Sequence, residues 1–397
     1  MAYPVKWYAS QMQGAPSLGD TADGALAALL KAVLVTGFGT LTINSLVWDA
    51  ATGWAKATIS AGHAYLQDSV IEVSGASPAA YNGEHRAMKV SSTEVWFELD
   101  GGNPGSAASG VMSMKVAPLG WTLTHESGDG KMAIYRPTDV SASGNVSLRI
   151  DNTAFSGWFG ATYMGYLAKM QLVEDVVDIN TYTLIADQRW PATGRYSDKR
   201  WDLIGDPQLF YFLPAYASGN YQSMFAVGYL KSVRPGDRYH AITLNYSSTN
   251  ADDSNRRWNV GVGGSFTNYG TQGLTFDDTT NRLLARPYSQ LFGVVGCWFK
   301  GMFTRFGTGM NVPNGADNAF YMSTDPIMVM ETGNHLRGYL PGLICPFASV
   351  SAWYRKNFSN MPALPGKIVR FVSGTYTEST TQGAPTMVGF DLTGPWR

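Results

Sequence analysis

The chain has 397 residues, a formal net charge of −1 and only 15% charged side chains, against about 25% in an average soluble domain. It has no run of lysine and arginine residues, which argues against a nucleic-acid partner, because phosphate backbones are bound by clustered cations. Aromatic residues make up 13% of the chain, and 44 residues are glycine. This composition predicts a β-rich protein with large contact surfaces that are buried against partners.

The first predicted unit, residues 1–39, holds a polar arm with several aromatic residues and one amphipathic helix over 23–35. Thr21 or Asp23 would accept a free backbone N–H at the start of this helix. Gly37 and Gly39 would end it. Because only one face is apolar, we expect the helix to lie on a sheet or on a neighbouring subunit. The apolar residues recur at helical spacing and are Leu26, Leu29, Leu30, Val33 and Leu34.

The second predicted unit, residues 40–118, is a small β-module. Short runs typical of strands alternate with clusters of turn residues. Asn82-Gly83 is a hairpin signal, because both residues tolerate a positive φ. The spacing of the runs predicts a small barrel or sandwich. The expected strands are 40–47, 54–60, 69–73, 86–90, 94–99 and 111–116.

The third predicted unit, residues 119–397, is a larger antiparallel domain that resembles a β-sandwich. A short helix is expected at 168–177, and loops at 247–257 and 307–318. The unit has no repeat of fixed period, which argues against a propeller or a solenoid. The expected strands are 131–135, 146–150, 162–166, 209–213, 224–229, 240–246, 258–263, 327–330 and 367–373. The fold class is therefore mainly β.

Histidine residues do not have the spacing of metal ligands, such as two histidines four positions apart. His63 precedes a predicted strand in a turn, and we expect it to make a backbone hydrogen bond. No metal site is predicted. The five histidines are His63, His85, His125, His240 and His335.

Paired carboxylates, which glycoside hydrolysis needs, occur at Asp252-Asp253 and Asp277-Asp278. Both pairs lie among Asn, Ser and Thr residues, which is typical of a solvated loop. The stretch 250–255 has enough oxygen atoms for calcium, but it lacks the residue order of an EF-hand loop. We therefore predict no catalytic residues and no enzyme activity.

Other signals for ligands are similarly weak. The stretch 261–264 (GVGG) does not lie between a strand and a helix, and the chain has no G-x-S-x-G motif, so no cofactor site is predicted. Exposed tryptophan rings can stack on sugars, but a place in the core or in a subunit interface is the favoured interpretation. The tryptophans concerned are Trp190, Trp201, Trp258, Trp298 and Trp353.

Cysteine usage and the N-terminal sequence bear on the cellular compartment. Cys297 and Cys345 are expected to be two buried thiols, with a single disulfide as the alternative. Residues 1–6 lack the basic start and apolar core of a signal peptide. The apolar segment 25–35 is too short to span a bilayer. We therefore expect synthesis in the cytoplasm without export of the isolated chain and without membrane insertion.

The C-terminal residues 391–397 (DLTGPWR) follow a predicted apolar strand, 387–390. Pro395 restricts the backbone before Trp396, so the indole can be presented with little further loss of entropy. Arg397 carries a guanidinium that can bind a carboxylate with two donors. We expect Trp396 to pack into a groove of the large domain or of an adjacent subunit. The alternative is a solvated tail.

Eight stretches resemble proteins from the tails of long-tailed bacteriophages. The β-module of those proteins has Gly-Phe where this chain has Ala64-Tyr65. The resemblance covers the first third and the last sixth of the chain well, and the middle loosely. The stretches are 34–39 (LVTGFG), 61–65 (AGHAY), 70–76 (VIEVSGA), 80–84 (AYNGE), 95–97 (VWF), 117–121 (APLGW), 338–343 (GYLPGL) and 391–397.

The best resemblance is to tail or baseplate proteins of siphophages, including transposable phages of Pseudomonas. It implies a structural subunit of the tail baseplate or tail tip, assembled in the host cytoplasm, located in the virion and contributing to host attachment. The expected partners are other tail proteins and further copies of the chain, with a trimer favoured.

Two other classes of virion protein stay open. One is a receptor-binding protein that recognises a host glycan or an outer-membrane protein, and the other is a capsid accessory protein. A glycan-degrading enzyme is disfavoured, because the chain lacks a clear carboxylate constellation.

Overall fold

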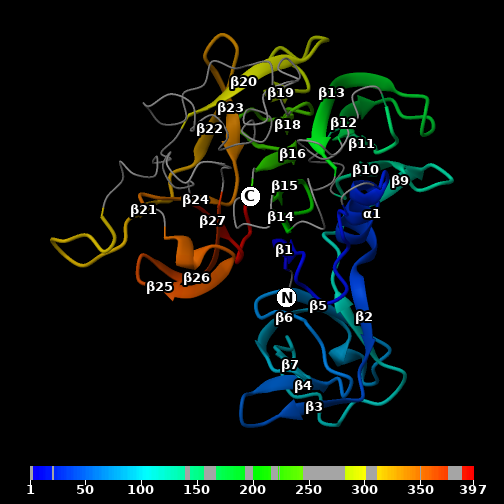
Figure 1. The fold of residues 1–397 in the computed structure, drawn as a ribbon, viewed down its shortest axis with the longest axis vertical. Helices are drawn as coiled ribbons and strands as arrows, with labels where there is room; N and C mark the ends of the chain where they lie inside the picture. The colour runs from blue at the N-terminus through cyan, green and yellow to red at the C-terminus, as the bar shows by residue number, and fades with distance from the viewer. Residues whose placement is uncertain are drawn as a thin grey trace.

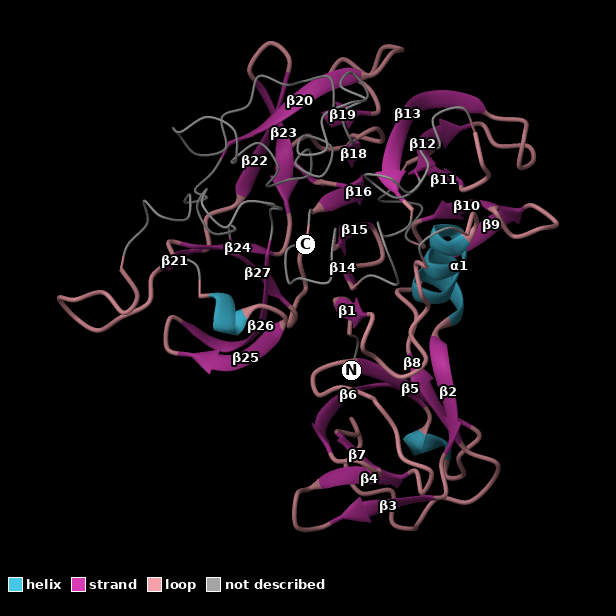
Figure 2. Cartoon of the chain, in the orientation of Figure 1, coloured by secondary structure: helices cyan, strands magenta, loops and turns pink. Residues whose placement is uncertain are grey.

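The computed structural model describes residues 3–19, 22–138, 144–155, 167–192, 200–215, 222, 224–244, 282–300, 311–348, 350–373 and 387–397. These residues form mainly antiparallel β-structure with one short α-helix, as Figure 2 shows. The predicted mainly-β fold class is confirmed. The description of the module as a barrel or sandwich, and of the larger part as sandwich-like, stays a prediction.

Residues 38–116 form one seven-stranded antiparallel sheet, which we call the module sheet. The expected strands are confirmed, except that 40–47 covers the ends of two strands separated by Ile43 and Asn44. The expected hairpin turn at Asn82-Gly83 is wrong, because Asn82 is extended with a φ of −80° and Gly83 already belongs to β6; a short 3-10 helix, Ala79–Tyr81, lies in the connection before that strand. In spatial order the strands are β2 (Phe38–Thr42), β8 (Ser113–Val116), β5 (Val70–Ser74), β6 (Gly83–Val90), β7 (Glu94–Phe97), β4 (Trp54–Thr58) and β3 (Ser45–Asp49).

A ten-stranded antiparallel sheet, the central sheet, contains the N-terminal strand β1 and nine strands from residues 201–340. The expected polar arm is wrong for residues 6–9, which form a buried strand paired with residues 202–205. In spatial order the strands are β1 (Lys6–Ala9), β14 (Trp201–Gly205), β15 (Leu209–Pro214), β16 (Phe225–Tyr229), β18 (Ala241–Leu244), β19 (Arg282–Leu284), β20 (Val295–Lys300), β22 (Ile327–Glu331), β23 (His335–Leu340) and β17 (Lys231–Ser232).

A five-stranded sheet corrects the expected helix at 168–177, because most of this stretch is strand. The strand is buried at every residue except Lys169, so it lacks the alternation that marks a strand in sequence. Its Ala, Met, Gln and Leu residues favour helix, but pairing on both sides outweighs that local preference. In spatial order the strands are β13 (Thr183–Pro191), β12 (Leu167–Glu174), β11 (Ser147–Asp151), β10 (Met132–Arg136) and β9 (Thr122–Glu126).

The last part of the chain forms another five-stranded sheet, the C-terminal sheet. A 3-10 helix, Ser351–Trp353, lies before its strand β25. The expected strands at 367–373 and 387–390 are confirmed, whereas 162–166 and 258–263 lie outside the described residues. In spatial order the strands are β21 (Met322–Ser323), β24 (Leu343–Pro346), β27 (Met387–Asp391), β26 (Leu364–Ser373) and β25 (Lys356–Met361).

The predicted N-terminal helix is present as α1 (Ala25–Lys31), continued by a π-helical turn, Ala32–Thr36. Neither expected cap is confirmed: Thr21 lies outside the described residues, and Asp23 pairs with Lys131 instead. The amide oxygen of Asn152 accepts hydrogen bonds from the first free N–H groups, at 2.9 Å from Leu26 N. A residue distant in sequence therefore caps the helix.

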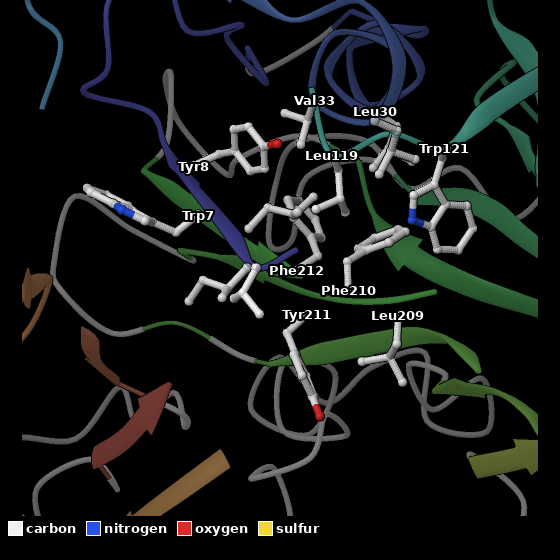
Figure 3. Close-up of a cluster of buried hydrophobic side chains, with 14 of the residues drawn as sticks. Trp7, Tyr8, Leu30, Val33, Leu119, Trp121, Leu209, Phe210, Tyr211 and Phe212 are labelled. Carbon is white, nitrogen blue, oxygen red and sulfur yellow. The ribbon is translucent and has the colours of Figure 1, made fainter. Parts of the chain in front are cut away.

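The apolar face of α1 packs into the core of its own chain. Leu30 and Val33 are fully buried and point toward Leu119 and Trp121, as Figure 3 shows. Gly37, with a φ of 70°, ends the helical segment as predicted. Of the two predicted locations for this face, the structure shows the one within the chain.

One hydrophobic core connects the module sheet, α1 and the central sheet. Within it, Tyr8 of β1 donates its hydroxyl proton to Ala117 O at 2.9 Å. In Figure 1 the module strands β3 and β4 lie at one end of the long axis, and β18, β19 and β20 lie toward the other. The chain thus presents two distant ends joined by a continuous core.

Candidate functional site

The predicted carboxylate pairs Asp252-Asp253 and Asp277-Asp278 lie outside the described residues. The stretches 250–255 and 261–264 and Trp258 lie outside them as well. In the part of the chain that the structure describes, no group of three or more His, Cys, Asp or Glu residues is placed to hold a metal ion.

His63 is a turn histidine with backbone partners, as predicted. Its Nδ1 accepts the Tyr65 backbone N–H at 3.1 Å, and its Nε2 donates to Glu94 O at 3.2 Å. Burial lowers its pKa, although the hydrogen bond to Glu94 opposes that effect. His85 likewise donates from Nε2 to Tyr81 O at 3.0 Å and stacks on Phe97. Both histidines therefore make hydrogen bonds to backbone groups within the module.

The other histidines lie in separate places. His240 is buried against Tyr229, with ring centroids 4.9 Å apart, and donates from Nδ1 to Asp237 O at 2.5 Å. His335 is exposed next to the Tyr288 ring, whereas His125 lies on β9 beside Thr124. The five predicted positions are therefore not brought together.

Cys297 and Cys345 are buried free thiols, which confirms the favoured interpretation over a disulfide. Burial raises the pKa of Cys297 to about 12 and also raises the pKa of Cys345. A thiol that stays protonated is a poor nucleophile. Both cysteines therefore act as small core residues in this structure.

The tryptophans that were considered for sugar stacking differ in exposure. Trp190 and Trp201 are fully buried, which confirms the core interpretation for these two. Trp190 stacks on Phe212 with ring centroids 5.8 Å apart. Trp298 and Trp353 are half-buried. A flat, freely accessible ring face is therefore not available at Trp190 or Trp201.

The C-terminal Trp396 docks on the chain itself, as predicted. Its side chain is 7% exposed, packs edge-on against Tyr211 and donates from Nε1 to Asp391 O at 2.8 Å. Gly342 makes room for the ring, since a Cβ there would lie 2.1 Å from the indole. The groove that holds Trp396 thus depends on a glycine 54 positions earlier.

Arg397 binds a carboxylate with two donors, again as predicted. Its Nε lies 2.9 Å from Asp206 Oδ2, and its Nη2 lies 3.3 Å from Asp206 Oδ1. Its Nη1 also donates to Tyr229 O at 2.9 Å and to Leu230 O at 3.2 Å. The last residue of the chain is therefore fixed to the central sheet, which excludes a solvated tail.

Several stretches that carry the resemblance to tail proteins meet at this groove. Asp391 N donates to Gly342 O at 2.9 Å, which joins 391–397 to 338–343. Trp121 Nε1 donates to Asp206 O at 3.2 Å, beside the Arg397 guanidinium. Stretches more than 200 residues apart in sequence therefore form one structural junction.

The same junction extends to the helix and to the module sheet. Leu119 N donates to Val33 O at 2.8 Å, so 117–121 also lies against the end of the helical segment. Arg86 on β6 donates from Nη2 to Leu392 O at 2.8 Å. The junction therefore holds the module, the helix and the C-terminus together.

Like the junction, a buried ionic cluster around Asp202 connects segments that are distant in the sequence. Its carboxylate accepts hydrogen bonds from Arg370 at 2.5 Å, from Arg355 at 2.9 Å and from Gln222 at 2.7 Å. Burial raises the pKa of Asp202, but the two guanidinium groups and the hydrogen bond from Gln222 together lower that pKa by a larger amount. The net shift of the pKa is therefore downward. This cluster links β14 to β26 and so holds the central and C-terminal sheets together.

A second buried ionic cluster surrounds Arg337 on β23. The guanidinium binds Asp237 at 2.7 Å and Glu331 at 2.6 Å, and all three side chains are buried. It also donates to Arg286 O at 2.7 Å. Arg337 therefore connects two segments to the sheet: the turn after β17 and the loop between β19 and β20.

The loop formed by residues 286–294 is held firmly at its base. Tyr288 N donates to both carboxylate oxygens of Glu331, at 3.1 and 2.9 Å. Arg286 binds Glu174 on β12 at 2.5 and 2.6 Å and stacks on the Tyr239 ring at 3.7 Å. Both the backbone and the side chains of the loop base are thus fixed by charged partners.

The tip of the 286–294 loop exposes four apolar side chains. Phe292 is 84% exposed, Leu291 69%, Tyr288 48% and Val294 40%. A large exposed apolar group on an ordered loop is a sign of an interaction site. Sequence reasoning did not select this loop, although the run 291–295 (LFGVV) was the available signal.

A scan against models of known protein families gives no match for this chain, and no curated protein matches its sequence. Among the described residues, no helix is long and apolar enough to cross a membrane.

Proposed function

We propose that the chain is a structural subunit of the tail baseplate or tail tip of a long-tailed bacteriophage. It assembles with other tail proteins and with further copies of itself, with a trimer favoured, and contributes to host attachment. The observation that carries this proposal is the junction around Trp396. Stretches that resemble tail proteins are scattered over the sequence, yet several of them contact one another there.

The chemistry of the junction supports a structural role. Its bonds are made by indole and guanidinium groups to backbone carbonyls and to the buried carboxylate of Asp206. Such bonds fix the relative position of segments and leave no reactive group free for chemistry at these atoms. A fixed frame of this kind is consistent with a structural subunit of an assembly.

Receptor binding is a second candidate role, favoured by the 286–294 loop. This loop lies in the middle of the sequence, which the resemblance covers only loosely, and it exposes Leu291 and Phe292. β19 and β20, which flank it, lie toward the end of the long axis opposite β3 and β4 (Figure 1). One end would serve assembly and the other attachment.

Quantitative mass spectrometry of purified particles, combined with gold-labelled antibodies in electron microscopy, tests the proposal. We expect the chain in purified tails, in a copy number divisible by three, with label at the tail tip. Label on the head would favour a capsid accessory protein instead. Absence of the chain from particles would refute a virion role.

We propose no enzymatic activity for the chain. Purified protein is expected to release no product from cell-wall or lipopolysaccharide fractions. Product release that is abolished by Asp252→Asn with Asp253→Asn would overturn this part of the proposal.

A further inference from the structure

The 286–294 loop combines a fixed base with a tip whose apolar side chains are exposed. Its ionic and backbone groups are bound to Glu174, Glu331 and Arg337. Leu291 and Phe292, by contrast, remain largely exposed. Exposing such side chains gains no burial energy within this chain. Because the base of the loop is fixed, Leu291 and Phe292 are kept exposed, where they can contact an apolar environment outside the chain.

Cationic side chains lie on a segment that is connected to the base of this loop. β17 carries Lys231, and the turn after it carries Arg234 and Arg238, all exposed, and Val233, which is 43% exposed. Arg337 connects this turn to the loop, because Val233 N donates to Arg337 O at 3.1 Å while the Arg337 guanidinium binds Arg286 O. We call the 286–294 loop and residues 231–238 together the apolar–cationic face.

The buried carboxylates beneath this face are already neutralised. Glu174, Asp237 and Glu331 are buried and each is paired with an arginine. Asp175 and Asp178, on the neighbouring β12–β13 hairpin, are exposed and keep their negative charge, because their printed hydrogen-bond donors are neutral amide and N–H groups. On the loop and the β17 turn themselves, the exposed charge is positive.

We propose that the apolar–cationic face docks on a lipid bilayer that carries anionic phosphate headgroups. Leu291 and Phe292 enter the boundary between headgroups and acyl chains, while Lys231, Arg234 and Arg238 lie against the phosphates. Apolar burial and attraction to anionic lipid both strengthen such interfacial contacts. The charge complementarity favours this occupant over an apolar pocket of another protein, which would not require the cations.

This contact is peripheral and differs from insertion of a spanning segment. It deepens the host-attachment part of the proposed function and rests on that function for its biological setting. Binding to pure lipid vesicles needs no other virion protein, so its outcome is separate from that of particle incorporation. Vesicles can fail to bind even if the chain is found in tails, and the reverse also holds.

Flotation of the full chain with vesicles tests the proposal. Vesicles of phosphatidylcholine alone are compared with vesicles containing phosphatidylglycerol, at low and at high salt. We expect binding to the anionic vesicles, weakened by salt because screening acts on the exposed cations. No flotation of the wild-type chain with either vesicle would overturn the proposal.

Substitutions separate the two components of the face. The double variant Leu291→Ser with Phe292→Ser is expected to bind anionic vesicles at least about tenfold more weakly, since two apolar side chains are lost. Arg234→Glu should remove most of the preference for anionic lipid. Val111→Ser changes a side chain that is 92% exposed in the module and should leave vesicle binding unchanged.

The melting temperature of each variant establishes that the fold is intact. If the double variant melts like the wild type and still binds vesicles equally well, the loop is not the lipid contact. If it binds vesicles equally well but fails to join tails, the loop is a protein interface and the lipid proposal is wrong.

Discussion

Two segments of the chain use the same residue types with opposite results. The C-terminal segment, 391–397, and the 286–294 loop each carry an aromatic side chain and an arginine bound to a carboxylate. Arg397 binds Asp206, and Arg286 binds Glu174. Trp396 is nevertheless buried, at 7% exposure, whereas Phe292 is 84% exposed.

The difference in burial separates a segment that stabilises the fold from one that we propose binds a partner. Removal of a buried indole leaves a cavity and loses its contacts, so Trp396 contributes to the free energy of unfolding. Phe292 contacts the Arg286 guanidinium at 4.6 Å but gains little from burial. An aromatic residue that is held in place without being buried is better explained by binding than by folding.

The largest expected effect is on the C-terminal segment. Truncation after Thr393 removes Trp396 and Arg397, which should lower the free energy of unfolding by about 3–5 kcal/mol. The melting temperature of the purified chain should then fall by several degrees. Calorimetry on the truncated and intact chains measures both quantities. Equal melting would mean that the docked tail contributes nothing.

Gly342→Ala is a matched way to displace the indole without shortening the chain. A Cβ there would lie 2.1 Å from the Trp396 ring, and φ is +78°. Gly366→Ala is the control, because φ is +73° and no atom lies within 4 Å of the added Cβ. Backbone strain is common to both variants. A greater loss of stability in Gly342→Ala than in Gly366→Ala is therefore due to displacement of the Trp396 ring from its groove.

A smaller effect comes from pH, through a histidine that lies between the two segments. His240 contacts the Tyr229 ring, and the Tyr229 carbonyl accepts a bond from Arg397. Its other neighbour, Asp237, pairs with Arg337 below the loop. Burial lowers the pKa of His240; Asp237 opposes this effect, whereas Arg397 and Arg337 add to it.

The sign of the pH effect follows from that lowered pKa. The folded state binds fewer protons than the unfolded state, so stability is fully present above about pH 6.5 and falls as the pH drops toward the folded pKa. We expect a loss on the order of 1 kcal/mol between pH 7 and pH 5. Denaturant unfolding at both pH values measures it.

His240→Gln should reduce this dependence without abolishing it, since burial also lowers the pKa of His63 and of His85. His125→Gln is the control on β9. If His240→Gln and the wild type lose the same stability on acidification, His240 does not link the two segments in the way described.

Sequence reasoning succeeded where the signal was local. The module strands follow from alternation and turn residues, and the docking of Trp396 follows from a stiff Pro395 before an aromatic ring. It failed for β12, whose two faces are both covered, so that alternation is missing. It also missed β1, because its partner β14 lies nearly 200 residues later.

The fixed position of the 286–294 loop could not be predicted from the sequence, for a related reason. The base of the 286–294 loop is fixed by Glu174, Glu331 and Arg337, which come from three separate strands. A single sequence gives no sign that these residues meet. The run 291–295 could have been a core strand, and only the structure shows that its first residues are exposed.

The smallest expected effect on stability is at the loop tip. Phe292→Ala should change the free energy of unfolding by no more than about 0.5 kcal/mol, as is usual for exposed sites. Phe299→Ala is the matched control, because Phe299 is fully buried on β20, seven positions later. The control should lose about 3–5 kcal/mol. Denaturant titration of both variants measures the contrast.

A stability loss in Phe292→Ala close to that of Phe299→Ala would mean that the ring is packed in solution. The loop would then belong with the C-terminal segment, and its exposed tip could not be assigned to a partner. A neutral Phe292→Ala that also loses vesicle binding would place the whole effect at the contact with the partner. The two segments would then differ in purpose as well as in exposure: Arg397 positions a ring for folding, and Arg286 positions one for attachment.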